Sequence, residues 1–398
     1  MEQPVAARWP STCPACSSEA ARFGYQVRNV PTNSVCILRS EAEARCVAVG
    51  DIDLAGCASC GFIWNAVFDP TLVEYSSNYE ATQAYSDTYS RFLRDQADEF
   101  VKTHGLHRKT IVEIGCGHGE FLAALCEAGD NTGLGYDPAF SPDRAPRINR
   151  GSYRVLAEIF DANTQLPKAD LICCRNTLEH IPDVGAFVKS LRIAIGDDGH
   201  PMVFFQVPSW ERIAYEGAFW DVYYEHCSYF TVESLRSLFD RNGFDVLSCE
   251  RSFGDQYLTL LARPASAAPL KSERANTDTP SFEETGRALR EKAADWSARL
   301  SDSASNATST VLWGGGSKAV ALLTTCGKST SVAAVVDINP HKDGTFLPLS
   351  AHCVIAPEKL RSVRPDRIVV MNPIYTGEIR KQLDELQIEA DILELGTT

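Results

Sequence analysis

Short apolar runs alternate with helical segments in two separate stretches of this 398-residue chain. The first stretch contains TIVEIG, TGLGYD, YRVLA, ADLICC, PMVFFQVP, FDVLSCE and YLTLLARP, with helical segments such as GEFLAALCEAG between them. The second stretch contains STVLW, SVAAVVD, HCVIA and DRIVVMN. Continuous apolar runs separated by helices are typical of buried parallel strands. The pattern predicts two α/β domains, one over residues 106–265 and a smaller one over residues 308–398.

The remaining residues divide into three connecting parts. Residues 10–65 are rich in cysteine, glycine and polar turns, which predicts a small module that needs a cross-link to fold. Residues 66–105 end in helical periodicity and are interpreted as a bridge of helices. Residues 266–307 begin with an aperiodic segment rich in Pro, Ala, Ser and Thr and continue into a polar helix, which predicts a linker and a helix.

Charge and hydropathy exclude two classes of partner. The net charge is −14, so the chain lacks the basic surface that binds a nucleic-acid backbone. No run of about 18 apolar residues is present, and the start of the chain has no basic segment followed by an apolar one. We therefore expect a cytoplasmic protein that acts on a small molecule and binds neither nucleic acid nor membrane.

Four of the fourteen cysteines form two C-x-x-C pairs. In a reducing compartment such pairs indicate metal binding rather than disulfides, and two thiolates on one tight turn can occupy adjacent corners of a tetrahedron. The predicted ligands of one structural Zn²⁺ are Cys13, Cys16, Cys57 and Cys60. Cys36 and Cys46 lie between the pairs and could replace a ligand. The alternative is a set of unrelated core thiols.

A glycine-rich loop, IVEIGCGHGEFL, joins the first strand of the larger α/β domain to the following helix. Its glycines allow the backbone to approach a ligand, and the helix N-terminus offers unpaired amides. The next strand ends on Asp137, 24 positions after Glu113, where a carboxylate can accept hydrogen bonds from ribose hydroxyls. The E-x-G-x-G-x-G spacing resembles the S-adenosylmethionine loop of class I methyltransferases, and a dinucleotide site with its G-x-G-x-x-G spacing is the alternative.

The same resemblance extends to the segment CCRNTLEHIPD, which follows the fourth strand. Open α/β sheets bind ligands at the carboxyl ends of their strands, so the loop and this segment should converge. The residues expected to contact S-adenosylmethionine are Glu113, Gly115, Gly117, Gly119, Asp137 and Asn176. His180, in the second segment, is expected to face the substrate.

The order of these parts resembles the nucleotide-sugar C-methyltransferase family along almost the entire chain. The resemblance rests on the paired cysteines, LEHI, YYEHCSYF, WGGGSK, VVDINPHKDGTFLP and DRIVVMNPIY. It implies a class I methyltransferase Rossmann-like domain flanked by a small zinc-binding module and a second Rossmann-like α/β domain. It also implies S-adenosylmethionine-dependent methylation of the carbon next to a keto group on a nucleotide-activated deoxysugar or a related small molecule.

The family's catalytic base is the histidine of a Y-x-E-H segment, and the matching residue here is His226. A carbon becomes nucleophilic only after a base removes its proton, and the pKa of histidine suits that task. The resemblance implies that Glu225 orients His226 or the sugar, and that Tyr223 or His180 donates a hydrogen bond to the developing enolate. The alternative for this segment is aromatic packing around an ordinary hydrogen-bonded histidine.

Two further regions are expected to contact the acceptor, namely YSSNYEATQAYSDTY and the second glycine loop, WGGGSK, at a helix N-terminus where anions are favoured. The expected contact residues are Tyr79, Gln83, Gly315, Ser317 and Lys318. The alternative for the terminal domain is that it only closes over the active site. Tyr224 stands where the family often has histidine, so we expect it to mark a different acceptor.

Two other functions are compatible with the sequence. A methyltransferase of the same fold could act on oxygen or nitrogen of another natural-product intermediate, which requires no enolate. A zinc-bearing binding protein without enzymatic activity is the third hypothesis, and the intact glycine loop weighs against it.

Overall fold

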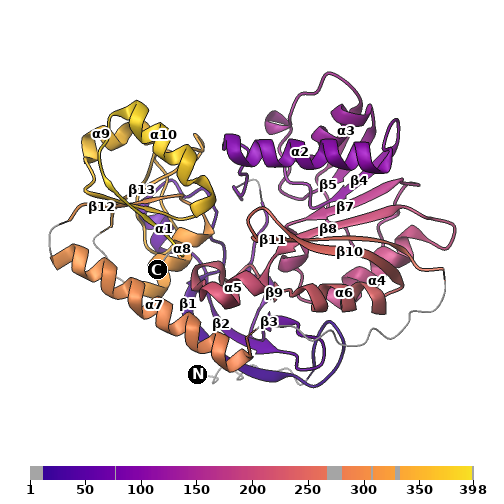
Figure 1. Cartoon of the computed structure of the whole chain (residues 1–398), viewed down its shortest axis with the longest axis horizontal. Helices are drawn as coiled ribbons and strands as arrows, with labels where there is room; N and C mark the ends of the chain where they lie inside the picture. Colours follow the sequence, from indigo (N-terminus) through magenta and orange to yellow (C-terminus); the bar gives the residue numbers. More distant parts are fainter. Residues whose placement is uncertain (1–11, 77, 267–279, 306–307, 328–331, 397–398) are drawn as a thin grey trace.

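The structure is a computed structural model that describes residues 12–76, 78–266, 280–305, 308–327 and 332–396. These residues form a four-stranded, a seven-stranded and a five-stranded sheet. In Figure 1 the seven-stranded sheet lies on the right, the five-stranded sheet on the left, and the long N-terminal strands run below. Most of the linker predicted after residue 265 lies outside the described residues. Within the described ranges, we find no helix with the length and apolarity needed to cross a bilayer.

The seven-stranded sheet has the order β10-β11-β8-β7-β4-β5-β6. Its strands are β4 (Thr110–Ile114), β5 (Thr132–Tyr136), β6 (Ser152–Leu156), β7 (Leu171–Arg175), β8 (Met202–Pro208), β10 (Phe244–Ser252) and β11 (Tyr257–Pro264). The prediction of parallel strands is wrong for β10 and β11, because β11 pairs antiparallel with both β10 and β8. Only residues 253–256 separate β10 from β11, and this connection is too short for the crossover that parallel pairing needs.

Helices cover both faces of this sheet. They are α2 (Asp87–His104), α3 (Glu120–Gly129), α4 (Val184–Ile195) and α6 (Val232–Arg241). Side chains of α2 and α3 share one apolar cluster with β4 and β7, and side chains of α4 and α6 share another. Among the described residues of the predicted bridge of helices, α2 is the single α-helix, since residues 73–76 and 78–86 are irregular. Helix α2 begins at the Ser86 cap and ends at Gly105, whose φ is 63°.

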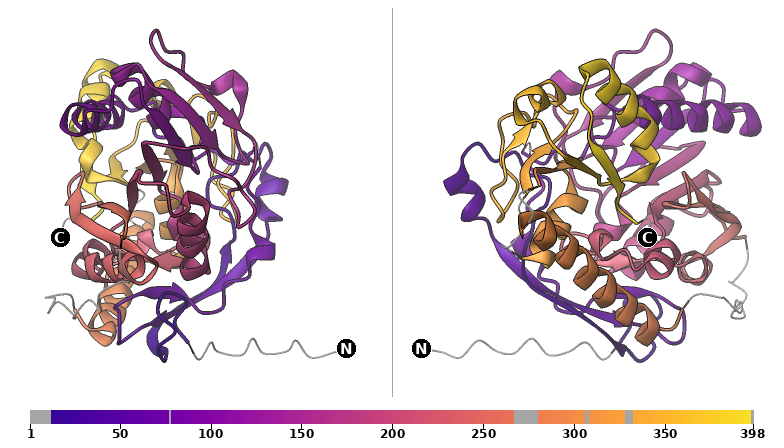
Figure 2. Two further views of the ribbon diagram at one scale, coloured as in Figure 1. Left: turned by 90° about the vertical axis from the view of Figure 1, so that its right-hand side faces the viewer. Right: turned by 60° about the vertical axis from the view of Figure 1, so that its left-hand side comes forward.

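The five-stranded sheet is parallel throughout, with the order β14-β13-β12-β15-β16. Its strands are β12 (Thr310–Trp313), β13 (Val332–Val336), β14 (Val354–Ile355), β15 (Arg367–Val370) and β16 (Asp391–Glu394). Its helices are α8 (Ser317–Cys326), α9 (Leu360–Val363) and α10 (Thr376–Leu386). Helix α7 (Phe282–Ser305) lies along the N-terminal strands (Figure 2), where Leu289, Trp296 and Leu300 are buried.

The N-terminal sheet joins strands from two distant parts of the chain. It contains β1 (Ala21–Pro31), β2 (Val49–Gly56), β3 (Ile63–Asn65) and β9 (Ser228–Tyr229), and helix α1 (Glu41–Arg45) precedes β2. Strand β9 is the end of the YYEHCSYF segment and pairs with β3. The cysteine-rich region is therefore built directly onto the segment that carries His226.

The remaining helices are short. They are η1 (Pro70–Leu72), η2 (Pro142–Arg144), η3 (Leu178–His180), α5 (Trp210–Glu216), η4 (Phe219–Asp221), η5 (Pro357–Lys359) and η6 (Pro373–Tyr375). Four of them, η3, α5, η4 and η6, bring polar side chains to the space between the two larger sheets.

Candidate active site

The two C-x-x-C pairs meet in one cluster. The Sγ atoms of Cys13 and Cys60 are 3.8 Å apart, those of Cys16 and Cys57 are 3.5 Å apart, and all four lie within 4.8 Å of one another. Four thiolates about 2.3 Å from a tetrahedral Zn²⁺ are about 3.8 Å from each other, so this donor set fits the ion. Cys36 and Cys46 are not part of the cluster.

A cavity of about 370 Å³ lies at the carboxyl ends of β4, β5 and β7. Gly115 and Gly117 line it with φ values of 68° and 57°, a region of backbone conformation that glycine adopts without strain. A Cβ atom on Gly115 would lie 2.0 Å from Oγ1 of Thr177, so the close approach requires glycine. Gly119 does not line the cavity, since it caps α3 and faces the ring of Tyr153 instead.

Two carboxyl groups, the buried Glu113 and the half-buried Asp137, stand at this glycine loop. Asp137 accepts hydrogen bonds from the amides of Gly117 at 2.7 Å and Ala139 at 2.8 Å, so it holds the loop in shape. Burial raises the pKa of Asp137. Burial also raises the pKa of Glu113 to about 8, although the charge of Arg175 opposes the shift. Both side chains line the cavity.

Some residues of this cavity were not expected from the sequence. Among them, Glu158, Ile159 and Phe160 follow β6 and line the cavity. The signal was available, because β6 ends at the same edge of the sheet as β4 and β5.

A second cavity, of about 360 Å³, lies between the seven-stranded and five-stranded sheets, and we call it the acceptor cavity. Residues of YYEHCSYF, α8, β11 and α10 line it. It shares lining residues with the glycine-loop cavity, namely Tyr79, Ala81, Thr82, Gln83, Asn176 and His180. The two cavities therefore adjoin.

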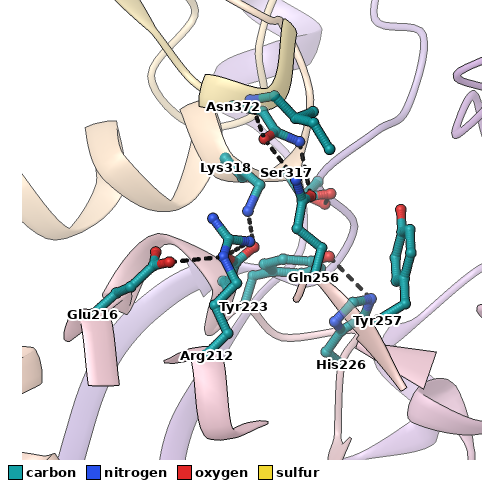
Figure 3. Close-up of polar contacts among 12 residues, drawn as sticks. Arg212, Glu216, Tyr223, His226, Gln256, Tyr257, Ser317, Lys318 and Asn372 are labelled. Carbon is teal, nitrogen blue, oxygen red and sulfur yellow. Dashed lines mark hydrogen bonds and ion pairs between the residues drawn. The ribbon is translucent and has the colours of Figure 1, made fainter. Parts of the chain in front are cut away.

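His226 lines the acceptor cavity and is 8% exposed. Its Nε2 atom and the hydroxyl of Tyr223 are 3.0 Å apart and share a hydrogen bond (Figure 3). The ring of His180 stands edge-on to the ring of His226, with 4.8 Å between the ring centroids. Burial, together with nearby His180 and Lys318, lowers the pKa of His226 well below its usual value, so this imidazole is neutral at neutral pH.

Glu225 is fully buried and bonds to the N-terminal segment. Its Oε1 atom accepts hydrogen bonds from the amide of Ser34 at 2.8 Å and from the Ser34 hydroxyl at 2.6 Å. The structure thus corrects the expectation that Glu225 contacts the histidine or the sugar, because its partner is the N-terminal segment and it does not line the acceptor cavity.

The two predicted hydrogen-bond donors already have partners. Tyr223 pairs with His226, and Nδ1 of His180 lies 2.9 Å from the hydroxyl of Tyr75. Burial lowers the pKa of His180 to about 4, so it also is neutral. Tyr75 belongs to the aromatic segment singled out in the sequence, but only the fold places it beside His180.

Three further residues that were expected to matter for the site lie in different surroundings. Gln83 lies between two tyrosines, since its Nε2 donates to Tyr257 at 3.3 Å and its Oε1 accepts from Tyr375 at 2.8 Å. Tyr224 does not line the cavity and packs on Phe68, so the structure gives no support to the expectation that it marks the acceptor. Asn176, whose φ is 49°, lies where both cavities meet.

The second glycine loop places only part of its predicted set in the acceptor cavity. Ser317 and Lys318 line it, and Lys318 forms an ion pair with Asp221, which Arg212 approaches to 3.8 Å. Figure 3 shows the side chains of Lys318 and Arg212 close to one another. Gly315 does not line the cavity, because its amide donates to Asp337 at 2.9 Å. The structure gives no support to the expected ligand contact of Gly315.

Comparisons with known proteins agree with this architecture. Residues 81–249 match the family model of a methyltransferase domain, and residues 264–391 match that of a C-methyltransferase C-terminal domain. C-methyltransferase NovU from Streptomyces niveus is 24% identical over 381 residues, which cover 90% of this chain and 88% of that protein.

Other relatives match shorter segments. Ubiquinone biosynthesis O-methyltransferase from Hydrogenovibrio crunogenus is 30% identical over 117 residues, 27% of this chain and 46% of that protein. Magnesium protoporphyrin IX methyltransferase from Synechocystis, solved with bound SAH, aligns with 45% of this chain and 84% of its own at 14% identity and a TM-score of 0.35. The predicted class I methyltransferase fold is confirmed by the family match over residues 81–249. The chain therefore belongs to the S-adenosylmethionine-dependent methyltransferases and combines a methyltransferase domain with a C-methyltransferase C-terminal domain.

Proposed function

We propose that this enzyme methylates the carbon next to a keto group on a nucleotide-activated deoxysugar or a related small molecule, with His226 as the base. One observation carries the proposal: a buried, neutral histidine lines a cavity that adjoins the glycine-loop cavity. The similarity to C-methyltransferase NovU along 90% of the chain supports transfer to carbon.

The residues of the glycine-loop cavity suit S-adenosylmethionine, since the glycines leave room for close approach and the strand-end carboxyls stand beside them. When bound, S-adenosylmethionine supplies an electrophilic methyl group. The residues that would contact it all line this cavity, and they are Glu113, Gly115, Gly117, Asp137 and Asn176. His226 removes the proton of the acceptor carbon, and the hydrogen bond to Tyr223 holds the imidazole in place for that transfer.

The product distinguishes this function from transfer to oxygen or nitrogen. After incubation with a 4-keto nucleotide sugar and ¹³C-methyl-labelled S-adenosylmethionine, we expect a C–CH₃ resonance in the product. An O–CH₃ or N–CH₃ resonance from the acceptor that the enzyme actually uses would contradict the proposal. Binding of S-adenosylmethionine without any product from a broad set of keto sugars would contradict the acceptor class.

We propose that Lys318 helps to bind the phosphates of the nucleotide. It lies in the first turn of α8, where the helix N-terminus favours anions, and its ammonium group pairs with Asp221 beside Arg212. Lys318→Met should raise the KM for the nucleotide sugar about tenfold with little change in kcat, because it removes one charge-assisted contact. Lys359→Met, which removes an exposed lysine paired with Asp343, is the control. An unchanged KM in steady-state assays would assign Lys318 to domain closure alone.

A further inference from the structure

Glu179 is a buried carboxyl group without a recorded partner. It lies in η3 directly after β7, is 1% exposed, and neither carboxyl oxygen has a hydrogen-bond partner among the described residues. The side chain lines the acceptor cavity. A carboxyl oxygen of Glu179 and one ring nitrogen each of His180 and His226 all lie within 4.8 Å of one another.

The surroundings of Glu179 favour its neutral form. Burying an isolated carboxylate without a cation or donor is costly, and a group in that position keeps its proton instead. The nearby histidines offer no charge, since burial lowers the pKa values of both. A neutral carboxyl carries one O–H donor, and among the residues described no acceptor is recorded for it.

Two other donors beside the proposed base are occupied. Tyr223 shares its hydrogen bond with His226, and His180 shares one with Tyr75. An acceptor molecule that enters the cavity therefore meets Glu179 as a buried donor whose hydrogen bond is still to be made. A carboxylic acid held neutral in an apolar site can stabilise an enolate by donating to its oxygen.

We propose that Glu179 is a catalytic residue that donates a hydrogen bond to the keto oxygen of the acceptor while His226 removes the neighbouring proton. This inference rests on the proposed function. In the step, the C–H bond breaks and an N–H bond forms on His226, while the electron pair becomes the C=C bond and charge moves to the oxygen that Glu179 contacts. When the carbon then takes the methyl group, the electron pair of the broken S–CH₃ bond stays on sulfur, which leaves as the thioether S-adenosylhomocysteine, while the C=O bond forms again and Glu179 retains its proton.

The proposal sets the pH dependence of turnover. Charged or titratable groups around the site are His180, Tyr75, Tyr223, Glu225, Cys227 and Lys318. Burial raises the pKa of Glu179 to about 8, and the step needs this group protonated, so turnover should fall as the pH rises through about 8. The step also needs His226 neutral, and its lowered pKa places the acid limb well below the usual histidine value of about 6.5.

Two substitutions separate donation from a structural role. Glu179→Leu keeps most of the volume and removes the donor, so kcat should fall about 100-fold or more with little change in KM. Glu179→Gln keeps an N–H donor that does not titrate, so kcat should fall less and the alkaline limb near pH 8 should disappear. The control is Glu211→Gln, at a carboxyl that is 7% exposed, outside both cavities and bonded to the amide of Val232.

Three results would overturn the proposal. They are a kcat of Glu179→Leu within about threefold of the parent enzyme, a pH profile of Glu179→Gln identical to that of the parent, and a parent profile without an alkaline limb near pH 8. The last result needs no substitution, so it remains decisive if thermal unfolding shows that a variant is misfolded.

Metal analysis tests the competing role, because one carboxyl and two imidazoles are also metal ligands. A second divalent ion per chain, lost in Glu179→Gln but not in Glu211→Gln, would overturn the proposal in favour of a metal site.

Deuterium exchange at the acceptor carbon separates this inference from the proposed function. If the acceptor carbon still exchanges deuterium in the presence of His226→Ala, the assignment of His226 as the base fails. If His226→Ala loses this exchange while both Glu179 variants keep full activity, only the role of Glu179 is refuted.

Discussion

His226→Ala should lower turnover about 1,000-fold and leave the affinity for S-adenosylmethionine unchanged. A positioned base accelerates proton transfer by about 100- to 10,000-fold, and the carbon acid cannot react before it loses its proton. His226 lines the acceptor cavity but not the glycine-loop cavity, so cofactor binding should not depend on it. Single-turnover product analysis measures the first effect, and calorimetric titration with S-adenosylmethionine measures the second.

The control for this prediction is His200→Ala, because His200 is exposed in the turn before β8 and outside both cavities. Deuterium exchange at the acceptor carbon, followed by NMR without the methyl donor, should also be lost in His226→Ala. Near-normal turnover with normal exchange would eliminate His226 as the base. Lost turnover together with lost cofactor affinity would indicate a general structural defect instead.

We propose that the four-cysteine cluster binds one structural Zn²⁺. Cys57→Ser should then release the metal, lower the midpoint of thermal unfolding by about 10 °C or more, and reduce turnover, although Cys57 touches neither cavity. Turnover should fall because the cysteine cluster is connected to the His226 segment through a pair of strands. Strand β3 begins shortly after the second C-x-x-C pair and pairs with β9, and the amide of Asn65 donates to the carbonyl of Cys227 at 2.9 Å. Loss of the cluster thus loosens the residues that follow His226 directly.

Metal content, thermal unfolding and turnover should be measured together for this variant. The control is Cys46→Ser, because Cys46 is exposed and outside the cluster. Treatment of the unmodified protein with a chelator should reproduce the effects of Cys57→Ser. A variant that loses its zinc and keeps its unfolding midpoint and turnover would refute the connection between the cluster and His226.

Parts of the site that depend on short-range chemistry were predictable. The glycine loop needs only a strand, a turn with left-handed glycines and a helix, and Gly115 and Gly117 have that geometry. The strand-end rule brought Asp137 and Asn176 to the cavity, and the same rule, applied to β6, would have found Glu158. Gly119 and Gly315 do not line the two cavities, because a glycine motif alone does not say which glycine faces a ligand and which faces the protein.

By itself, the sequence determined the alternation of strands and helices, the two C-x-x-C pairs and the segment that carries His226, because each is a local pattern read within a few residues. Only the tertiary structure decided the partners. Glu225 bonds to Ser34 across 191 positions, and Lys318 pairs with Asp221 across 97. Those contacts depend on how three sheets pack together, and so does the isolation of Glu179, since burial and the lack of a partner exist only once the chain is folded.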